Sequence, residues 1–255
     1  MIIYPKKKIK RKINFAQIGL TLYFSDEEFL NKYGLKANDA ILVEEHQMGI
    51  FDDMAKNKKV DYVAGGAAQN TIRGAQYVLP PKSTAYIGCV GDDEYAKTLC
   101  EVNAKAGVET LYMVSEVPTG KCAVVITGHQ RSLCTLLGAA CEYKVDHMRQ
   151  PEVWKVVEGA EFYYIGGYHL AVSMDSIAAL GEEAVAKNKV FTMNVSAPYM
   201  VIAFKDRFDQ ALTYCDYLIG NESEMLAYAE DRKLDVCKLL CIIVFYIFLF
   251  IYWSL

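Results

Sequence analysis

Short apolar segments that alternate with helical stretches are the feature that most constrains the fold of this chain. Each segment ends at or next to a glycine or a polar residue, as at 84–90, 163–166, 190–194 and 217–220. This alternation predicts an α/β domain with a mainly parallel sheet flanked by helices. Because such sheets bind ligands at the carboxyl ends of their strands, the residues that follow these segments are the first candidates for a functional site.

The remaining elements follow from the same patterns. Further strands are expected at 13–24, 62–66, 110–114 and 120–127, and a turn at 127–132. Further helices are expected at 46–59, 71–79 and 94–106. Ser25 and Glu28 have the spacing of a capping box, which predicts that another helix begins there.

The stretch 64–75 follows a short strand and reads Ala-Gly-Gly-Ala-Ala-Gln-Asn-Thr-Ile-Arg-Gly-Ala. Two adjacent glycines allow a positive φ and let a ligand approach the backbone closely. A glycine turn that opens a helix also presents free N–H groups to the oxygens of a ligand. Asn70 adds an amide that both donates and accepts hydrogen bonds. The stretch is therefore either a tight strand-to-helix turn or a ligand cradle.

Size and charge narrow the functional classes. With 255 residues the chain can bury the core of one large domain, and its net charge of −4 argues against nucleic acid as a partner. The basic run at 6–12 is expected to be a solvated tail, with a targeting or membrane-surface role as the alternative. No apolar run of a signal peptide follows it. Eight scattered cysteines predict reduced thiols in the cytoplasm and no zinc site.

The segment 239–255 differs from the rest of the chain. It carries no charge and contains neither glycine nor proline. Its length is at the lower limit for a membrane-spanning helix, so a membrane segment that would make the protein membrane-associated is one hypothesis. The other is an apolar tail foreign to the domain, the product of a truncated or alternatively spliced reading frame.

Four segments at predicted strand ends occur together: Ala-Gly-Gly-x-x-Gln-Asn from residue 64, Thr-Gly-Lys-Cys with Gly-His-Gln-Arg-Ser-Leu, Asn-x-Ser-Ala-Pro-Tyr from 194, and Gly-Asn-Glu-x-Glu from 220. In this order the chain resembles the ribokinase-like, or pfkB, family of sugar and nucleoside kinases. Within that family it is most similar to the branch that phosphorylates adenosine. The resemblance extends over most of the chain, from about residue 25 to 235.

The resemblance implies a ribokinase-like mainly parallel sheet flanked by helices, with a small β lid. It places an incomplete kinase domain at 1–235, with lid strands within about 13–45 and 110–140, and leaves 236–255 outside the family. The C-terminal strands of the sheet are expected to be missing. The implied activity is ATP-dependent phosphorylation of adenosine to AMP by a cytoplasmic enzyme, expected to be a monomer.

Residue roles carry over at the matching positions. Gly66 and Asn70 are implied to hold the ribose hydroxyls, and Gly65 is implied to bind the substrate as well. The implied contacts of the purine and the rest of the substrate are Leu42, Cys122, Leu133, Leu137, His169 and Tyr199. Apart from the resemblance, leucines at such positions are more often core residues, and a lone histidine such as His169 is more often a packed polar residue.

The phosphate end is implied to contain three residues. Arg131 matches an arginine that neutralises charge on the transferred phosphate. Asn221 and Glu224 match an element that organises Mg²⁺ and the phosphates of ATP, with Glu224 acting on the metal through water. The same two residues have the spacing of a helix N-cap and its capping-box partner, and both interpretations can hold together.

The sequence departs from the family pattern at several positions. Leu20 falls at or near an acidic residue that grips the ribose diol, Ala67 replaces a frequent serine, and Tyr168 and His169 stand where an aromatic pair is expected. No Asp-Thr-x-Gly-Ala-Gly-Asp segment occurs, so the general-base aspartate and the anion hole are missing from these residues. Three hypotheses stay open: an adenosine kinase by descent that is impaired or inactive, a non-catalytic adenosine-binding or membrane-tethered fragment, and a related sugar kinase.

Overall fold

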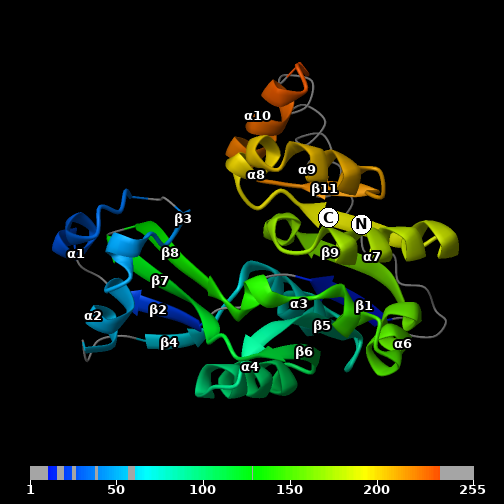
Figure 1. The fold of residues 1–255 in the computed structure, drawn as a ribbon, viewed down its shortest axis with the longest axis horizontal. Coiled ribbons are helices and arrows are strands. Elements are labelled where there is room, and N and C mark those ends of the chain that lie inside the picture. The colour runs from blue at the N-terminus through cyan, green and yellow to red at the C-terminus, as the bar shows by residue number, and fades with distance from the viewer. Residues whose placement is uncertain are drawn as a thin grey trace, which may run out of the picture.

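The structure, a computed structural model, describes residues 11–15, 20–24, 27–37, 40–56, 61–127 and 129–235. These residues form a larger body, built around one sheet, and a smaller lid built around a second sheet (Figure 1). The basic residues at 6–10 and the apolar segment 239–255 lie outside the described residues, as does Ser25. No helix within the described ranges is long and apolar enough to cross a membrane.

The body sheet has the strand order β11-β10-β9-β1-β5-β6, and every neighbouring pair is parallel. Its strands are β1 (Arg11–Phe15), β5 (Thr84–Gly91), β6 (Glu109–Ser115), β9 (Ala160–Gly166), β10 (Val190–Asn194) and β11 (Tyr217–Ile219). The chain runs outward from β1 in one direction through β5 and β6, and in the other through β9, β10 and β11. The strand order therefore reverses at β1, which is where open α/β sheets form their ligand crevice. The predicted α/β architecture, a parallel sheet flanked by helices, is confirmed.

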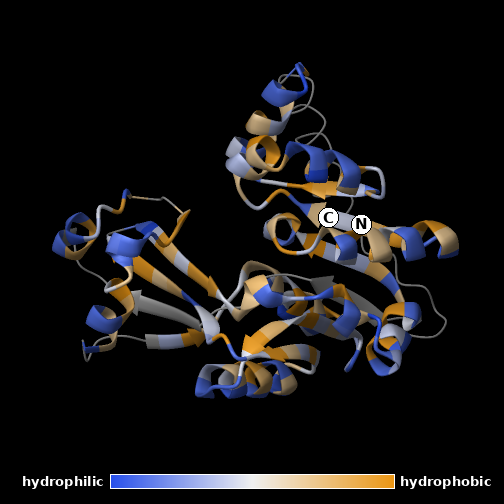
Figure 2. Cartoon of the chain, viewed as in Figure 1, coloured by the Kyte–Doolittle hydropathy of each residue, from blue (hydrophilic) through white to orange (hydrophobic). Residues whose placement is uncertain are grey.

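Alternate residues of β5 bury into cores on opposite faces of the body sheet. Tyr86 packs with residues of α3 and α4, whereas Ala85 and Ile87 pack with residues of α5 to α9. Hydrophobic residues accordingly gather on the strands and polar ones on the outer sides of the helices (Figure 2). The helices of the body are α3 (Ala67–Val78), α4 (Glu94–Lys105), α5 (Val145–Met148), α6 (Pro151–Gly159), α7 (Met174–Lys187), α8 (Pro198–Ala203), α9 (Lys205–Leu212) and α10 (Glu222–Asp231), with short 3₁₀ turns η2 (Ala139–Glu142) and η3 (Gly167–Ala171).

The lid sheet has the order β3-β8-β7-β2-β4 and mixes parallel with antiparallel pairs. Its elements are β2 (Leu20–Phe24), α1 (Glu27–Lys32), β3 (Ala40–Leu42), η1 (Glu45–Gln47), α2 (Ile50–Lys56), β4 (Asp61–Ala64), β7 (Thr119–Thr127) and β8 (Gln130–Gly138). Buried residues of α1 and α2, including Leu30, Ile50 and Met54, cover only one face of this sheet. The opposite face remains for contact with the body or a ligand.

Three expectations about the elements are wrong. The strand expected at 13–24 is two strands in different sheets, β1 and β2. The basic run expected to be a solvated tail contributes Arg11 and Lys12 to β1, which pairs on both sides. The turn expected at 127–132 is a short hairpin, because β8 begins at Gln130. In each case tertiary pairing decides the structure of residues whose local pattern is polar or ambiguous.

The other expected elements lie close to the observed ones. The helix expected at 46–59 is divided into η1 and α2, and 57–59 lie outside the described residues. The range 110–140 given for lid strands contains β7 and β8, while β6 belongs to the body sheet. The lid strand β4 lies outside both expected ranges.

Candidate functional site

The glycine turn connects lid to body. β4 ends at Ala64, Gly65 is buried, and Gly66 is the N-cap of α3 with φ 97° and ψ 123°. This conformation is one that a glycine adopts without strain and that a side chain would oppose. The Gly66 carbonyl accepts a hydrogen bond from the backbone N–H of Asn70 at 2.8 Å. The turn thus places the first turn of α3 beside the end of a lid strand.

A buried chain of hydrogen bonds fixes this turn from behind. Asn103 donates to the Tyr112 hydroxyl at 2.7 Å, that hydroxyl donates to Gln69 Oε1 at 2.8 Å, and Gln69 Nε2 donates to the Gly65 carbonyl at 3.0 Å. Burial raises the pKa of Tyr112, so its hydroxyl stays protonated and can donate. Asn103 and Tyr112 were not among the expected site residues, since their partners lie far away in the sequence.

Asn70 is held from the side by Arg73, one helical turn later. Arg73 Nη2 donates to Asn70 Oδ1 and, at 2.7 Å, to the carbonyl of Ala64. The Asn70 side chain is exposed. Because its oxygen faces the guanidinium, its NH₂ group is the part left to contact a ligand.

The open face of the lid sheet carries four of the residues expected to contact the purine. Leu42 is the register partner of Thr135, which pairs with Cys122 across β7 and β8. Leu133 and Leu137 lie two residues on either side of Thr135 on β8, so they share its face. The residues between them point toward α1 and α2, as Cys134 does. Leu42 is 43% exposed, as suits one wall of an open cleft.

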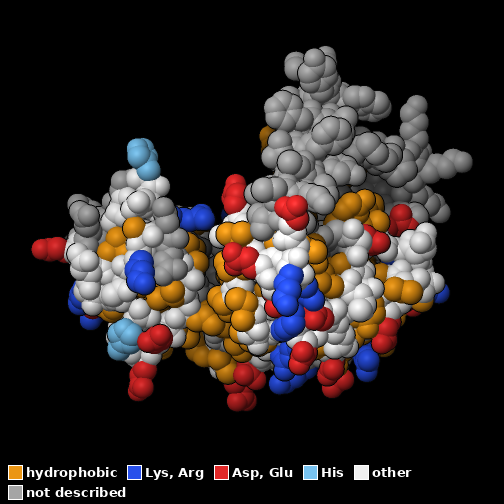
Figure 3. All heavy atoms as spheres, turned by 90° about the horizontal axis from the view of Figure 1, so that it is seen from above, with side chains coloured by type: hydrophobic (Ala, Val, Ile, Leu, Met, Phe, Trp, Pro, Cys, Tyr) orange, Lys and Arg blue, Asp and Glu red, His pale blue; other side chains and the backbone are white. Residues whose placement is uncertain are grey.

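Electrostatic neighbours connect this wall to the body. Tyr168, on η3 after β9, has a pKa raised by burial and then by its neighbours Tyr199, Glu224 and Cys122. Three segments distant in the sequence therefore come within electrostatic range of Tyr168. The rings of Tyr168 and Tyr199 are 6.4 Å apart and tilted. Lid and body meet at a notch with hydrophobic side chains on both sides (Figure 3).

Arg131 lies on the same face of β8 as Leu133, two residues away along the strand. Burial raises the pKa of the Cys122 thiol, and Arg131 is close enough to lower it in part. Thr135 Oγ1 donates to Cys122 Sγ at 3.3 Å. The arginine expected to act on a phosphate is thus exposed at the edge of the wall that Leu133 and Cys122 form.

The ends of β9 and β10 touch directly. Gly167 N donates to Ser196 Oγ at 2.8 Å, and a Cβ on Gly167 would come within 2.3 Å of the Val195 carbonyl oxygen. Ser196 has φ 72°, and its amide donates to Asn194 Oδ1 at 2.8 Å. The motif from residue 194 therefore shapes a strained loop at the carboxyl ends of neighbouring strands, a place where such strain accompanies function.

The Asn221 and Glu224 pair forms the capping box expected from its spacing. Asn221 Oδ1 accepts from Glu224 N at 2.9 Å, and Glu224 Oε2 accepts from Asn221 N at 3.0 Å. Asn221 Nδ2 also donates to Glu224 Oε1 at 3.1 Å. Burial raises the pKa of Glu224, and the Asn221 amide opposes that shift. Each carboxylate oxygen keeps a second lone pair for a further contact.

His169 lies apart from the open wall of the cleft. It is 4% exposed, and its ring centroid is 5.6 Å from that of Tyr143. Burial lowers the pKa of His169 to about 4, so the imidazole is neutral near pH 7. Of the residues expected to bind substrate, this is the one that the structure places in the core of the body.

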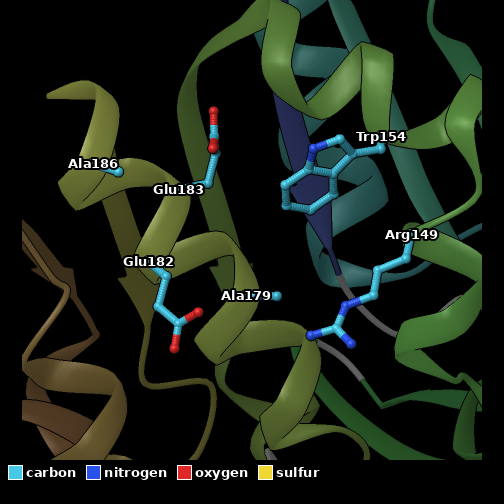
Figure 4. Close-up of a pocket in the computed structure, with 6 residues that line it drawn as sticks. All are labelled: Arg149, Trp154, Ala179, Glu182, Glu183 and Ala186. Atoms are coloured by element: carbon cyan, nitrogen blue, oxygen red, sulfur yellow. The ribbon is translucent and has the colours of Figure 1, made fainter.

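A separate hollow of about 440 Å³ lies between α6 and α7 (Figure 4). Its lining includes Trp154, Arg149, Glu182 and Glu183. Glu183 pairs with Lys189 at 2.7 Å, just before β10 begins. The hollow is therefore near the amino ends of the strands, away from the edge where parallel sheets bind ligands. It contains none of the residues that the sequence indicated.

Comparisons with known proteins agree with this geometry. A family model described as pfkB family carbohydrate kinase matches residues 27–239. Adenosine kinase of Schizosaccharomyces pombe is 52% identical over 206 residues, which make up 80% of this chain and 59% of that protein. Adenosine kinase 2 of Arabidopsis thaliana is 46% identical over 207 residues, 80% of this chain and 60% of that one. The chain spans about 60% of the length of these relatives.

Among solved structures, adenosine kinase of Anopheles gambiae in complex with di(adenosine-5) tetraphosphate is similar with a TM-score of 0.84 and 37% identity. The match covers 87% of this chain and 67% of that one.

Proposed function

The chain belongs to the pfkB family of carbohydrate kinases, and we propose that its cleft binds adenosine for phosphorylation of the 5′-hydroxyl by ATP. The observation that carries the proposal is that Tyr168, whose ring lies 6.4 Å from that of Tyr199 of α8, is within electrostatic range of Cys122 on the lid and of Glu224 on α10. An apolar wall opposite two tyrosine rings suits a flat purine. The identity with adenosine kinases supports the same ligand.

The ribose belongs at the glycine turn. Gly66 leaves room for a sugar beside the backbone, and the Asn70 NH₂ group is positioned to donate to a hydroxyl oxygen. The 5′-hydroxyl then points toward Arg131 and the start of α10, where the phosphate groups belong. An arginine at this position stabilises the charge that spreads over the transferred phosphoryl oxygens.

At the start of α10, the Glu224 carboxylate fits the role of an outer-sphere ligand of Mg²⁺. Both Glu224 oxygens already accept hydrogen bonds from Asn221, so the carboxylate can accept from metal-bound waters through its remaining lone pairs. Bound there, the ion would neutralise charge on the phosphates of ATP. Asn221 and Glu224 contribute a fixed, buried acceptor at that position. A cytoplasmic location is part of the proposal, since the six cysteines that the structure describes are all free thiols.

Calorimetric titration of the purified chain with adenosine tests the proposal. Leu133→Asp, which places a charge in the purine wall, is expected to abolish the binding heat. Val185→Asp, at an exposed position on α7 outside the cleft, is the matched control and should bind as the parent chain does. A native chain that gives no heat with adenosine, or that binds free ribose equally well, would overturn the assignment.

A further inference from the structure

We propose that Arg73 orients the side-chain amide of Asn70 so that its NH₂ group, and not its oxygen, contacts the substrate. This orientation makes the cleft selective for a ribose with both hydroxyls. This inference rests on the proposed function, because it concerns the same ribose subsite. The family resemblance and the sequence pattern pointed to Gly65, Gly66 and Asn70, and not to Arg73. The role of Arg73 follows from its hydrogen bonds and burial.

The chemistry of the contact leaves one orientation for the amide. A guanidinium group can only donate, so the Asn70 atom that faces Arg73 must be the oxygen. Spacing of three residues on α3 places the two side chains on one helix face. A free asparagine amide can rotate by 180° and offer either its oxygen or its NH₂ group. With Arg73 in place, the NH₂ group faces the cleft.

Arg73 is itself anchored outside the helix. Its Nη2 also donates to the carbonyl of Ala64, the last residue of β4, at 2.7 Å. Its position therefore depends on the lid strand as well as on α3. Arg73 thus connects the orientation of Asn70 to the junction between lid and body.

Burial of the guanidinium leaves the second terminal nitrogen of Arg73, Nη1, without a bond in the described part of the chain to compensate its loss of water. Arg73 Nη1 is buried and has no hydrogen-bond partner among the described residues, and none of the ion pairs found there includes Arg73. Burial lowers the pKa of the guanidinium, which nevertheless stays charged. A cation kept in such surroundings is explained by what its other nitrogen holds, namely Ala64 and Asn70.

The consequence for selectivity is specific. An oriented NH₂ group donates to a ribose hydroxyl oxygen, and a nucleoside that lacks the hydroxyl leaves this donor unpaired in the complex. Without Arg73, the Asn70 amide can rotate and adapt both to nucleosides that have the hydroxyl and to those that lack it. Loss of Arg73 should therefore reduce the preference for adenosine over its deoxy analogues more than it reduces purine binding in general.

The experiment is calorimetric titration of the purified chain and its variants with adenosine, 2′-deoxyadenosine and 3′-deoxyadenosine. Arg73→Met is expected to weaken adenosine binding about five- to tenfold. The ratio of the affinity for adenosine to the affinity for the deoxy analogue that the parent chain binds more weakly should fall by a similar factor. Arg73→Lys keeps one donor and should restore part of the ratio. Asn70→Leu keeps the approximate shape of the side chain but has no group that can bond the ligand, so it should lose the preference entirely.

Lys97→Met is the matched control, because it also removes a cation from a helix and breaks an i,i+3 contact, with Glu94, outside the cleft. It should leave all three affinities unchanged. If Arg73→Met has the thermal stability of the parent chain and keeps the parent ratio, Arg73 does not orient Asn70. If Arg73→Met does not fold, Arg73→Lys and Asn70→Leu provide the test, and a parent ratio in both variants overturns the proposal. A parent chain that binds none of the three nucleosides contradicts the proposed function instead.

Discussion

The two ends of the cleft are built in different ways. At the nucleoside end, the glycine turn is held by hydrogen bonds from Gln69 and Tyr112 behind it and by Arg73 beside it. At the phosphate end, Arg131 is exposed on β8, and the Asn221–Glu224 pair bonds within its own helix start. Hydrogen bonds between elements therefore hold the proposed nucleoside end, whereas Asn221 and Glu224 at the proposed phosphate end bond each other within one helix start. Binding and turnover should be separable in this chain.

The largest expected effect concerns turnover. The 255 residues contain no Gly-Ala-Gly-Asp segment, which is the segment that the family resemblance implies for the general base and the anion hole. General-base catalysis and oxyanion stabilisation each supply a factor of roughly 10² or more. A chain limited to these residues should therefore form AMP at least about 10⁴-fold more slowly than full-length adenosine kinase of Schizosaccharomyces pombe, while still binding adenosine.

A coupled assay with ATP, Mg²⁺ and adenosine measures this rate, and calorimetry measures binding on the same preparation. The two ends would not be separable if binding and turnover were lost together. Turnover comparable with the full-length relative would show that another group in these residues serves as the base.

The second prediction tests whether the backbone conformation of the glycine turn is needed for adenosine binding. Gly66→Ala puts a side chain at φ 97° and should weaken adenosine binding on the order of 100-fold, because the strain of roughly 1–3 kcal/mol is relieved only by moving the turn. Gly74→Ala on the same helix is the matched control, since a Cβ there meets no atom within 4 Å. Equal affinities of the two variants would show that the turn geometry does not matter for the ligand.

The sequence predicted the parts of this arrangement that depend on local pattern. Gly66, Asn70, Asn221 and Glu224 belong to contiguous motifs, and parallel strands bring the ends of β9, β10 and β11 to one edge of the sheet. The Asn221–Glu224 capping box is likewise a property of four consecutive residues.

What the sequence could not predict depends on distant partners. The Tyr112 hydroxyl reaches Gln69 across 43 positions, and nothing in the local pattern of either residue indicates the contact. β1 and β2 have similar patterns but belong to different sheets. His169 directly follows Tyr168, which lies near the cleft, yet only the packed structure shows that it is buried against Tyr143.

The third prediction uses that burial to test the body behind the nucleoside end. His169 has a pKa of about 4 in the folded chain, against about 6.5 when unfolded. Between these values the unfolded chain binds a proton that the folded chain does not, so stability falls as the pH falls from about 6.5 to 4. The free energy of unfolding should be about 2 kcal/mol lower at pH 5 than at pH 7 from this residue alone. His169→Phe should remove that part of the pH dependence in urea titrations, and parallel curves for the two chains would refute it.

The smallest expected effect sharpens the comparison at the phosphate end. Asn221→Ala removes the N-cap of α10 and should lower stability by about 1 kcal/mol. Ser173→Ala removes the corresponding cap of α7 and is the matched control for stability. Because Asn221 belongs to the phosphate end, both variants should bind adenosine as the parent chain does, and only Asn221→Ala should weaken binding of Mg²⁺–ATP. If Asn221→Ala instead weakened adenosine binding as strongly as Asn70→Ala, the start of α10 would belong to the nucleoside subsite, and the division of the cleft into two ends would be wrong.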